Sequence, residues 1–337
     1  MLFRAISLLL LGVPLYTSAL AAQGTLVVVN QKEHSVELVD PASKSVETRV
    51  PVGINGHEVA VSKDGKLAYV PIYSNVGVGK PGTNGQTIDV VDIASHTVVR
   101  SIDLGKPVRP HRAIFGPDGL LYVSAELDDA IYVVDTKTGT VVGKVPTGAE
   151  QSHMFYFSPD GKRIYTANVG EGSVSVIDVK AKKVLTTIPL TKRVQRMVVS
   201  KDGRWVFTSD WDQQRIAVID TKTDKLDRWI ATGAMPYVTE PTPDGKELLI
   251  GETSGHAGLL EVLDLATMTI IRSIPMASLP NAFLVHDGLA YMSCPGNGAI
   301  EILQMGASSP QTWALLPPIK LTPGVDGLGW SPITPKP

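Results

Sequence analysis

The sequence predicts an all-β fold, a seven-bladed β-propeller whose blades are four-stranded antiparallel sheets. Two repeated markers support this prediction. The first marker is a pair of apolar residues followed by aspartate. It ends at Asp40, Asp92, Asp135, Asp178, Asp220 and Asp264, at intervals of 52, 43, 43, 42 and 44 residues. The second marker is Asp-Gly, which occurs once between successive copies of the first, with its aspartate at Asp64, Asp118, Asp160, Asp202, Asp244 and Asp287. Two markers in phase, at a period of about 42 residues, indicate one structural unit repeated along the chain.

Each repeat has the periodicity of short β-strands. Residues Ser173–Asp178 alternate polar with apolar side chains, and residues Lys183–Ile188 alternate again after a short turn. Asp-Gly favours a tight hairpin turn, and Asp135–Gly139 has the composition of the next turn. No amphipathic helix is predicted within the repeats. A single four-stranded sheet cannot cover both of its faces, so we expect the units to stack around a closed ring.

The number of blades follows from the predicted third strands. Seven segments fit this strand: VELVD, IDVVD, IYVVD, VSVID, IAVID, LEVLD and IEILQ. Residues 24–30 match a second strand, so the first blade lacks its innermost strand. Residues 327–332 resemble the innermost strand at Met154–Pro159. The C-terminal strand is therefore predicted to complete the first blade and close the ring.

The ends and the composition of the chain predict its location. Residues 1–21 have an early Arg4, an apolar run of about 11 residues and a small-residue exit, which is typical of a signal peptide. The propeller is then expected over residues 22–337. No stretch reaches the roughly 20 apolar residues that span a bilayer. A periplasmic or secreted protein without a membrane span is predicted, and the class of organism stays open.

Composition excludes some partners and some means of stabilisation. Cys294 is the only cysteine, so no intrachain disulfide can form. A net charge of −2 gives no reason to expect nucleic acid as a partner. A small molecule or a protein is the expected partner, and the oligomeric state is unknown.

The segments Tyr165–Asn168, Ser173–Asp178 and Ser158–Lys162 resemble the YVTN-type β-propeller repeat, and the resemblance covers essentially the whole predicted propeller. Proteins with this repeat include lactonase-like enzymes, the haem d1 domain of cytochrome d1 nitrite reductases, and many binding or surface proteins. The resemblance implies the fold and leaves these functions open.

The innermost strands of a propeller line a central channel, so the first residue of each strand is a candidate for the channel mouth. Counting seven residues back from each hairpin aspartate gives His57, His111, His153, Gln195, Tyr237 and Pro280, and the C-terminal strand gives Asp326. Three imidazoles and a carboxylate in neighbouring blades suit a divalent transition metal. The alternative is that the histidines bond to loop carbonyls or to channel water, so the cofactor remains unknown.

Further polar candidates surround these positions. The arginines nearest to the histidine positions could hold an anionic ligand, or form surface ion pairs, and they are Arg109, Arg112 and Arg196. The ends of the second strands form another ring, in which Asn168, Asp210 and Glu252 could bind a ligand or line a solvated channel. Residues 73–86 are an insertion rich in glycine, either a lid over the channel or a mobile segment without function.

Three functions remain open from the sequence. The first is a propeller that binds a small molecule, a metal centre or a partner protein at the channel mouth. The second is an enzyme, either a metal-dependent oxidoreductase or a lactonase-like hydrolase or lyase, whose catalytic candidates are His57, His111 and His153. The third is a propeller that handles a haem cofactor. The sequence does not decide whether the protein is an enzyme.

Overall fold

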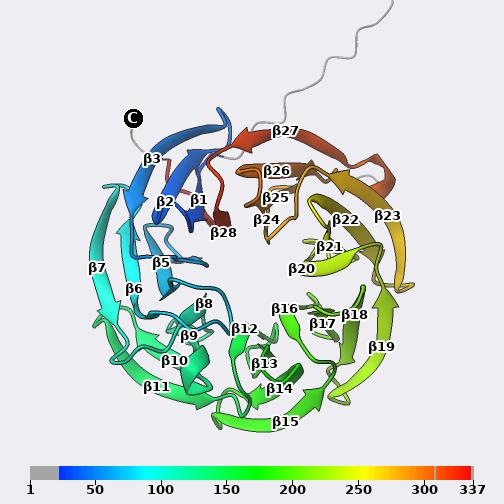
Figure 1. The fold of residues 1–337 in the computed structure, drawn as a ribbon, viewed down its shortest axis with the longest axis horizontal. Helices are drawn as coiled ribbons and strands as arrows, with labels where there is room; N and C mark the ends of the chain where they lie inside the picture. Colours follow the sequence, from blue (N-terminus) through cyan, green and yellow to red (C-terminus); the bar gives the residue numbers. More distant parts are fainter. Residues whose placement is uncertain (1–22, 307–308, 335–337) are drawn as a thin grey trace, which may run out of the picture.

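The computed structural model of the chain describes residues 23–306 and 309–334, and they form seven four-stranded sheets around a central channel. Figure 1 shows the sheets arranged radially, in chain order around the ring. The predicted seven-bladed β-propeller is confirmed. The predicted signal peptide at residues 1–21 lies outside the described residues.

Each blade runs from an innermost strand at the channel to an outermost strand at the rim. Blade 1 contains β28 (Val325–Ser331), β1 (Thr25–Asn30), β2 (Ser35–Asp40) and β3 (Ser45–Pro51). Blade 2 contains β4 (Ala60–Val61), β5 (Leu67–Ser74), β6 (Asn84–Asp92) and β7 (Thr97–Asp103). Blade 3 contains β8 (Pro110–Phe115), β9 (Leu121–Ala125), β10 (Ala130–Asp135) and β11 (Thr140–Pro146).

The other four blades repeat this order. Blade 4 contains β12 (Ser152–Phe157), β13 (Arg163–Asn168), β14 (Ser173–Asp178) and β15 (Lys183–Pro189). Blade 5 contains β16 (Val194–Val199), β17 (Trp205–Asp210), β18 (Arg215–Asp220) and β19 (Lys225–Ala231). Blade 6 contains β20 (Met235–Pro241), β21 (Glu247–Ser254), β22 (Ala257–Asp264) and β23 (Thr269–Met276). Blade 7 contains β24 (Ala282–His286), β25 (Leu289–Cys294), β26 (Ala299–Gln304) and β27 (Ala314–Lys320).

The C-terminal strand closes the ring as predicted. Strand β28 pairs antiparallel with β1, and Val27 lies opposite Gly329. All six residues of β1 are buried, because neighbouring blades cover both faces of this sheet. Burial of apolar surface between blades is the main stabilising contribution in a ring without disulfides.

The turns use the repeated aspartates. Asp135 accepts a hydrogen bond from the Lys137 backbone N–H at 2.8 Å, and Gly139 follows with a φ of 74°. A positive φ is strained for residues with a Cβ, so glycine suits this position. The aspartates that end the third strands of blades 1 to 6 therefore hold the outer turns, whereas β26 of blade 7 ends at Gln304.

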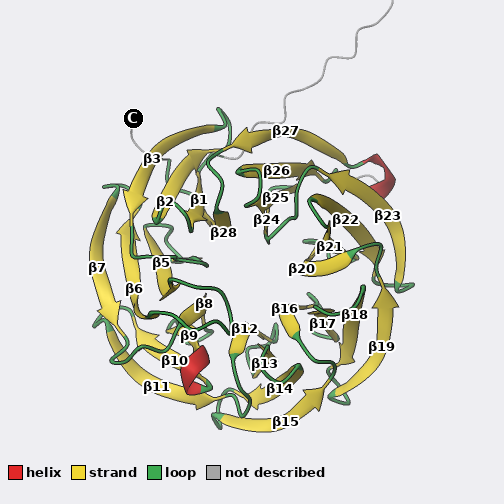
Figure 2. Cartoon of the chain, in the orientation of Figure 1, coloured by secondary structure: helices red, strands yellow, loops and turns green. Residues whose placement is uncertain are grey.

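Two details refine the prediction. The described residues include two short 3-10 helices, Glu126–Asp128 and Pro310–Thr312, which Figure 2 shows in red. The insertion at residues 73–86 is also shorter than expected, because β5 and β6 extend into it and leave residues 75–83 between them. Among the described residues, no helix is long and apolar enough to span a membrane.

Candidate functional site at the channel mouth

Three histidines and a tyrosine are packed together at the mouth of the channel. The ring centroids of His57 and His111 are 4.9 Å apart, and those of His111 and His153 are 3.7 Å apart. Tyr73, at the end of β5, contacts all three rings with centroid distances of 4.8, 5.4 and 6.3 Å. These side chains come from three neighbouring blades, so the closed ring brings them together.

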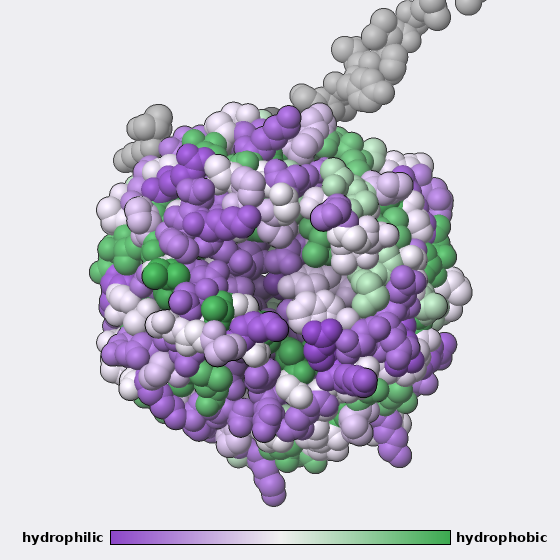
Figure 3. Space-filling view, in the orientation of Figure 1, coloured by the Kyte–Doolittle hydropathy of each residue, from purple (hydrophilic) through white to green (hydrophobic). Residues whose placement is uncertain are grey.

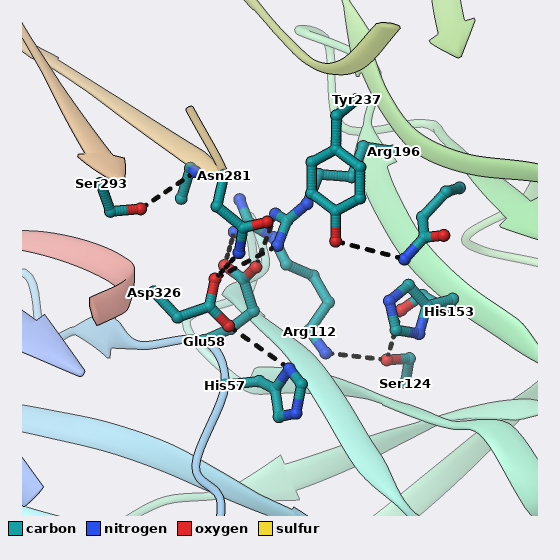
Figure 4. Close-up of polar contacts among 12 residues, drawn as sticks. His57, Glu58, Arg112, Ser124, His153, Arg196, Tyr237, Asn281, Ser293 and Asp326 are labelled. Atoms are coloured by element: carbon teal, nitrogen blue, oxygen red, sulfur yellow. Dashed lines mark hydrogen bonds and ion pairs between the residues drawn. The ribbon is translucent and has the colours of Figure 1, made fainter. Parts of the chain in front are cut away.

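Asp326 joins this cluster from the closing strand. Its carboxylate lies 3.3 Å from His57 Nδ1 and also accepts hydrogen bonds from Gln31 and Asn281. Figure 4 shows Asp326 linked to His57 on one side and to Asn281 on the other. Burial would raise the pKa of Asp326, but the bond to His57 and the nearby positive charges lower it. Asp326 is therefore ionised and fixes the orientation of His57.

A glycine brings Asp326 close to His57. The Gly327 backbone N–H donates to the His57 carbonyl at 2.9 Å. A Cβ at Gly327 would lie 2.5 Å from the same carbonyl oxygen, which is closer than real contacts allow. Only glycine lets β28 approach the residues before β4 so closely.

His153 is held by a different carboxylate. Its Nδ1 contacts Glu126, and the second oxygen of Glu126 accepts a hydrogen bond from Tyr73 Oη at 2.8 Å. Burial, together with the charge of Glu126, raises the pKa of Tyr73, so its hydroxyl remains a donor. Each outer histidine of the cluster is thus paired with a buried carboxylate.

His111 lies between them without such a partner. Burial lowers its pKa well below the ordinary value of 6.5, and the neighbouring His153, His57, Arg196 and Arg112 lower it further. His111 Nδ1 and His57 Nε2 are buried and have no hydrogen-bond partner among the described residues. The cluster therefore contains a neutral imidazole and two nitrogen atoms with unused hydrogen-bonding capacity.

We call His57, His111, His153, Gln195, Tyr237 and Asp326 the mouth layer, because each is the first channel residue of its blade. Gln195 donates from Nε2 to Tyr237 Oη at 3.4 Å. In blade 7 the sequence pointed to Pro280, but the side chain that reaches Asp326 is that of Asn281. Strand β24 spans only Ala282–His286, so the equivalent residue lies six positions before Asp287 and not seven.

The next residues along the strands form an arginine layer of Glu58, Arg112 and Arg196. The Glu58 carboxylate accepts from Arg112 and from Arg196, each at 2.7 Å. Burial alone would lower the pKa of Arg196, but the charge of Glu58 raises it. Arg196 is 3% exposed and Glu58 2% exposed, so these groups are paired charges shielded from solvent. Both arginines bond to Glu58 but keep an Nε without a partner, and a ligand-binding role for Arg112 and Arg196 stays a prediction.

The third predicted arginine holds the insertion. Arg109 Nε donates to Asn84 at 2.7 Å and its Nη2 donates to the Lys80 carbonyl at 2.6 Å. The guanidinium also lies 5.8 Å from the centre of the Tyr73 ring. Arg109 therefore connects the insertion at residues 75–83 to the histidine cluster.

The candidates of the predicted second ring bond to residues close to them in the chain. Each of its three candidates is fully buried and bonded inside its own blade. Asn168 bonds to Ser152 and Ser175, and Asp210 pairs with Arg215 at 2.9 Å. Glu252 accepts from the Ala234 backbone N–H at 2.5 Å. A ligand-binding role for these three residues stays a prediction.

The predicted metal site can be compared with the geometry. Within residues 23–306 and 309–334, no group of three or more His, Cys, Asp or Glu side chains is arranged to hold a metal ion. His57 and His153 direct their Nδ1 atoms at carboxylates, and His111 stacks on His153. Metal binding by His57, His111, His153 and Asp326 stays a prediction.

Reasoning from the sequence missed three members of the site: Tyr73, Glu58 and Asn281. A signal for Glu58 was present, because it follows His57 as Arg112 follows His111 and Arg196 follows Gln195. Opposite charges at the same position of neighbouring blades predict ion pairs across the channel.

Comparisons with known proteins agree with the fold. Residues 110–237 match the sequence model of the YNCE-like beta-propeller family. No curated protein sequence matches the chain.

Three solved structures show how far the likeness extends. The periplasmic gluconolactonase PpgL of Pseudomonas aeruginosa is 16% identical with a TM-score of 0.71, covering 93% of this chain and 99% of that one. The dihydro-heme d1 dehydrogenase NirN in complex with DHE is 15% identical with a TM-score of 0.65, covering 91% of this chain and 75% of that one. The hydrazine synthase of Kuenenia stuttgartiensis is 17% identical with a TM-score of 0.64, covering 81% of this chain and 88% of that one. The chain therefore resembles the lactonase-like and cytochrome d1-like propellers, as predicted, and its residues 110–237 carry the sequence pattern of the YNCE-like β-propeller family.

Proposed function

We propose that the protein binds a small, oxygen-rich organic molecule at the mouth layer of the channel. One observation carries this proposal: His57 Nε2 and His111 Nδ1 are buried beside each other's rings without a partner. A buried polar atom without a hydrogen bond costs about 1–3 kcal/mol, and a ligand hydroxyl or carbonyl would remove that cost. Neutral imidazoles can donate or accept, which suits hydroxyl and carbonyl groups.

The hydrophilic surface around the channel supports a polar ligand. Figure 3 shows hydrophilic side chains around the hollow at the centre of one face. His57 is the most exposed of the three histidines, with 14% of its side chain accessible. A ligand that enters the mouth would meet His57 first and His111 behind it.

A second candidate is an enzyme of the hydrolase or lyase class at the same site. The observation that favours it is the pair formed by His57 Nδ1 and Asp326, with Nε2 of the same ring unpartnered. A carboxylate at one nitrogen orients an imidazole and stabilises its protonated form, while the other nitrogen accepts a proton. His57 would act as general base, and His111 would donate to the developing oxyanion.

Glucono-1,5-lactone and gluconate are suitable probes, because a gluconolactonase is among the structural neighbours. Calorimetry measures binding of gluconate, and proton release at constant pH measures lactone opening. A binding protein takes up gluconate without accelerating hydrolysis. An enzyme hydrolyses the lactone, and His57→Gln lowers the rate by about 10²–10⁴-fold, the usual contribution of a general base.

The control is Glu47→Gln, an exposed carboxylate on the rim strand β3. It should leave both measurements unchanged. If His57→Gln and His111→Phe bind gluconate as tightly as the wild type, the mouth layer is not the site. If neither probe binds, a visible absorption spectrum and metal analysis of the purified protein test the metal and haem alternatives.

We also propose a periplasmic location. The sequence of residues 1–21 supports it, and the neighbour PpgL is described as periplasmic. Fractionation of cells that express the full chain tests this proposal, and recovery in the cytoplasm at full length would contradict it.

A further inference from the structure

Both layers of the channel contain buried polar atoms that have no hydrogen-bond partner among the described residues. In the mouth layer these atoms are Nε2 of His57, Nδ1 of His111 and Oε1 of Gln195. In the arginine layer they are Nε of Arg112 and Nε of Arg196. The five residues belong to blades 2, 3 and 5, so the unused hydrogen-bonding capacity continues from the mouth into the channel.

Two irregular strand pairings allow a mouth residue and the arginine after it to face the channel together. In a regular strand, successive side chains point to opposite faces of the sheet. The pairing of β8 with β9 is irregular at His111 and Arg112, and the pairing of β16 with β17 is irregular at Gln195 and Arg196. Irregularities of this kind redirect side chains and recur next to binding sites. The two layers therefore form one continuous polar surface.

The two arginines line a cavity of about 200 Å³ that adjoins the mouth layer. Glu58 and Tyr156 are also in its wall, together with Thr239, whose Oγ1 is buried and has no partner in the part of the chain that the structure describes. A dry cavity of about 150 Å³ holds one benzene molecule, so this space has room for one end of a small ligand. The rest of such a ligand would lie at the mouth.

The charge of the arginine layer indicates which end of a ligand it would accept. Glu58 is the counter-ion of both Arg112 and Arg196, at 2.7 Å from each, so two guanidinium groups share one carboxylate. Asp326 lies 3.6 Å from Arg196 Nη2, beyond hydrogen-bond distance, and is bonded to the mouth layer. Burial raises the pKa of Glu240, another carboxyl group in the wall, to about 7, so it is only partly ionised at neutral pH. The arginine layer by itself keeps an excess of one positive charge, which matches a carboxylate better than a doubly charged phosphate.

We propose that the ligand of the channel is a small hydroxy acid, whose carboxylate lies against Arg112 and Arg196 and whose hydroxyl groups lie against His57 and His111. This class of ligand rests on the binding function proposed for the mouth layer and specifies it further. The arginine Nε–H groups can only donate, and they bond more strongly to a carboxylate than to a neutral oxygen. A neutral polyol of the same length would satisfy the histidines but would lack the charged end.

Gluconate, glucitol and hexanoate are matched six-carbon probes. Glucitol has the hydroxyl groups without the carboxylate, and hexanoate has the carboxylate without the hydroxyl groups. Isothermal titration of the full chain should show gluconate binding at least about tenfold more tightly than either of the others, the difference expected from a charge-assisted hydrogen bond.

Two arginine variants test the position of the carboxylate. Arg112→Lys and Arg196→Lys keep a positive charge beside Glu58 and remove the Nε–H. Each should weaken gluconate binding by about tenfold and leave glucitol binding unchanged. The matched control is Arg228→Lys, at an exposed arginine of the rim strand β19, which should change neither affinity. Thermal melts show whether the three variants fold like the wild type.

The outcomes separate this ligand class from the function on which it rests. If His57→Gln weakens gluconate and glucitol by the same factor, the hydroxyl groups lie at the mouth as proposed. If glucitol binds as tightly as gluconate, or if both lysine variants keep the preference for gluconate, the hydroxy acid is wrong although the mouth still binds a ligand. If none of the three probes binds, the function proposed for the mouth fails together with the hydroxy acid.

Discussion

The mouth layer and the arginine layer occupy successive positions of the same strands, yet their polar groups are satisfied in different ways. In the arginine layer, Glu58 neutralises Arg112 and Arg196 in a compact set of ion pairs. In the mouth layer, His57 and His111 keep buried nitrogen atoms without partners. Both layers hold buried nitrogen atoms without partners, since Nε of Arg112 and Nε of Arg196 have none either. What differs is that ion pairs link the arginine layer across the channel, whereas His111 contacts its neighbours only through its ring. We therefore expect the arginine layer to contribute more to stability than the mouth layer.

The largest expected effect comes from breaking the arginine layer. Glu58→Ala leaves Arg196 buried without its main counter-charge, which should lower the free energy of unfolding by about 3–5 kcal/mol. Denaturant titration measures this loss. The exposed Glu47→Ala should change the same quantity by no more than about 0.5 kcal/mol. A loss below about 1 kcal/mol for Glu58→Ala would mean that the arginine layer is not a structural element.

The neighbouring carboxyl groups of Glu252 and Glu261 extend the comparison, because they carry charge of the same sign when both are ionised. Burial raises the pKa of Glu252 to about 9, and the neighbouring Glu261 raises it further. A raised pKa in the folded state means that its stability contribution is complete below the ordinary value of 4.5 and is lost as pH rises towards 9.

Glu252→Gln should therefore raise the melting temperature at pH 8 and flatten its decline between pH 6 and pH 9. Thermal melts at several pH values measure this effect. The exposed Glu47→Gln should follow the wild-type profile. Parallel wild-type and Glu252→Gln profiles would contradict the raised pKa.

The smallest effect on stability is expected in the mouth layer. His111→Phe keeps the ring contact with His153 and removes the unpartnered Nδ1, so the free energy of unfolding should change by less than about 1.5 kcal/mol. In the wild type, the pKa of His111 is lowered in the folded protein. The unfolded chain therefore binds the proton first, and the free energy of unfolding falls as pH drops below about 6.5.

This acid sensitivity should be weaker in His111→Phe than in the wild type. Thermal melts between pH 7 and pH 5 measure it, with the exposed His256→Gln as the control. If acid sensitivity is unchanged, another group is responsible for it. A loss above about 3 kcal/mol at pH 7 would show that the mouth layer is as structural as the arginine layer.

The sequence was sufficient to predict the fold because each blade repeats its turn residues in phase. Asp160 and Asp178 mark two turns of one blade, and the same markers recur around the ring. The convergence of His57, His111 and His153 followed from that repetition, since ring closure alone places equivalent residues together. The closing strand at Val325–Ser331 was also predicted, although it lies far from its partner β1 in the chain.

Other features depend on details that the repeat does not specify. Asn281 replaces Pro280 because β24 is short. Tyr73 reaches the cluster because β5 continues past the usual strand end. The partners of Arg112 and Arg196 depend on side-chain directions across the channel, and sequence spacing does not give those. Asn168, Asp210 and Glu252 bond to residues close to them in the chain, and one oxygen of Glu252 is buried without a partner.

The closing strand has one more consequence, for the order in which the protein matures. Asp326 lies on β28, and its partner His57 lies 269 positions earlier in the chain. A polypeptide still being synthesised, or one cut before this strand, has the imidazoles but lacks the carboxylate that orients one of them. Under the proposed function, the mouth binds its ligand only after β28 has paired with β1 and closed the ring, so an incomplete copy would not compete for the ligand.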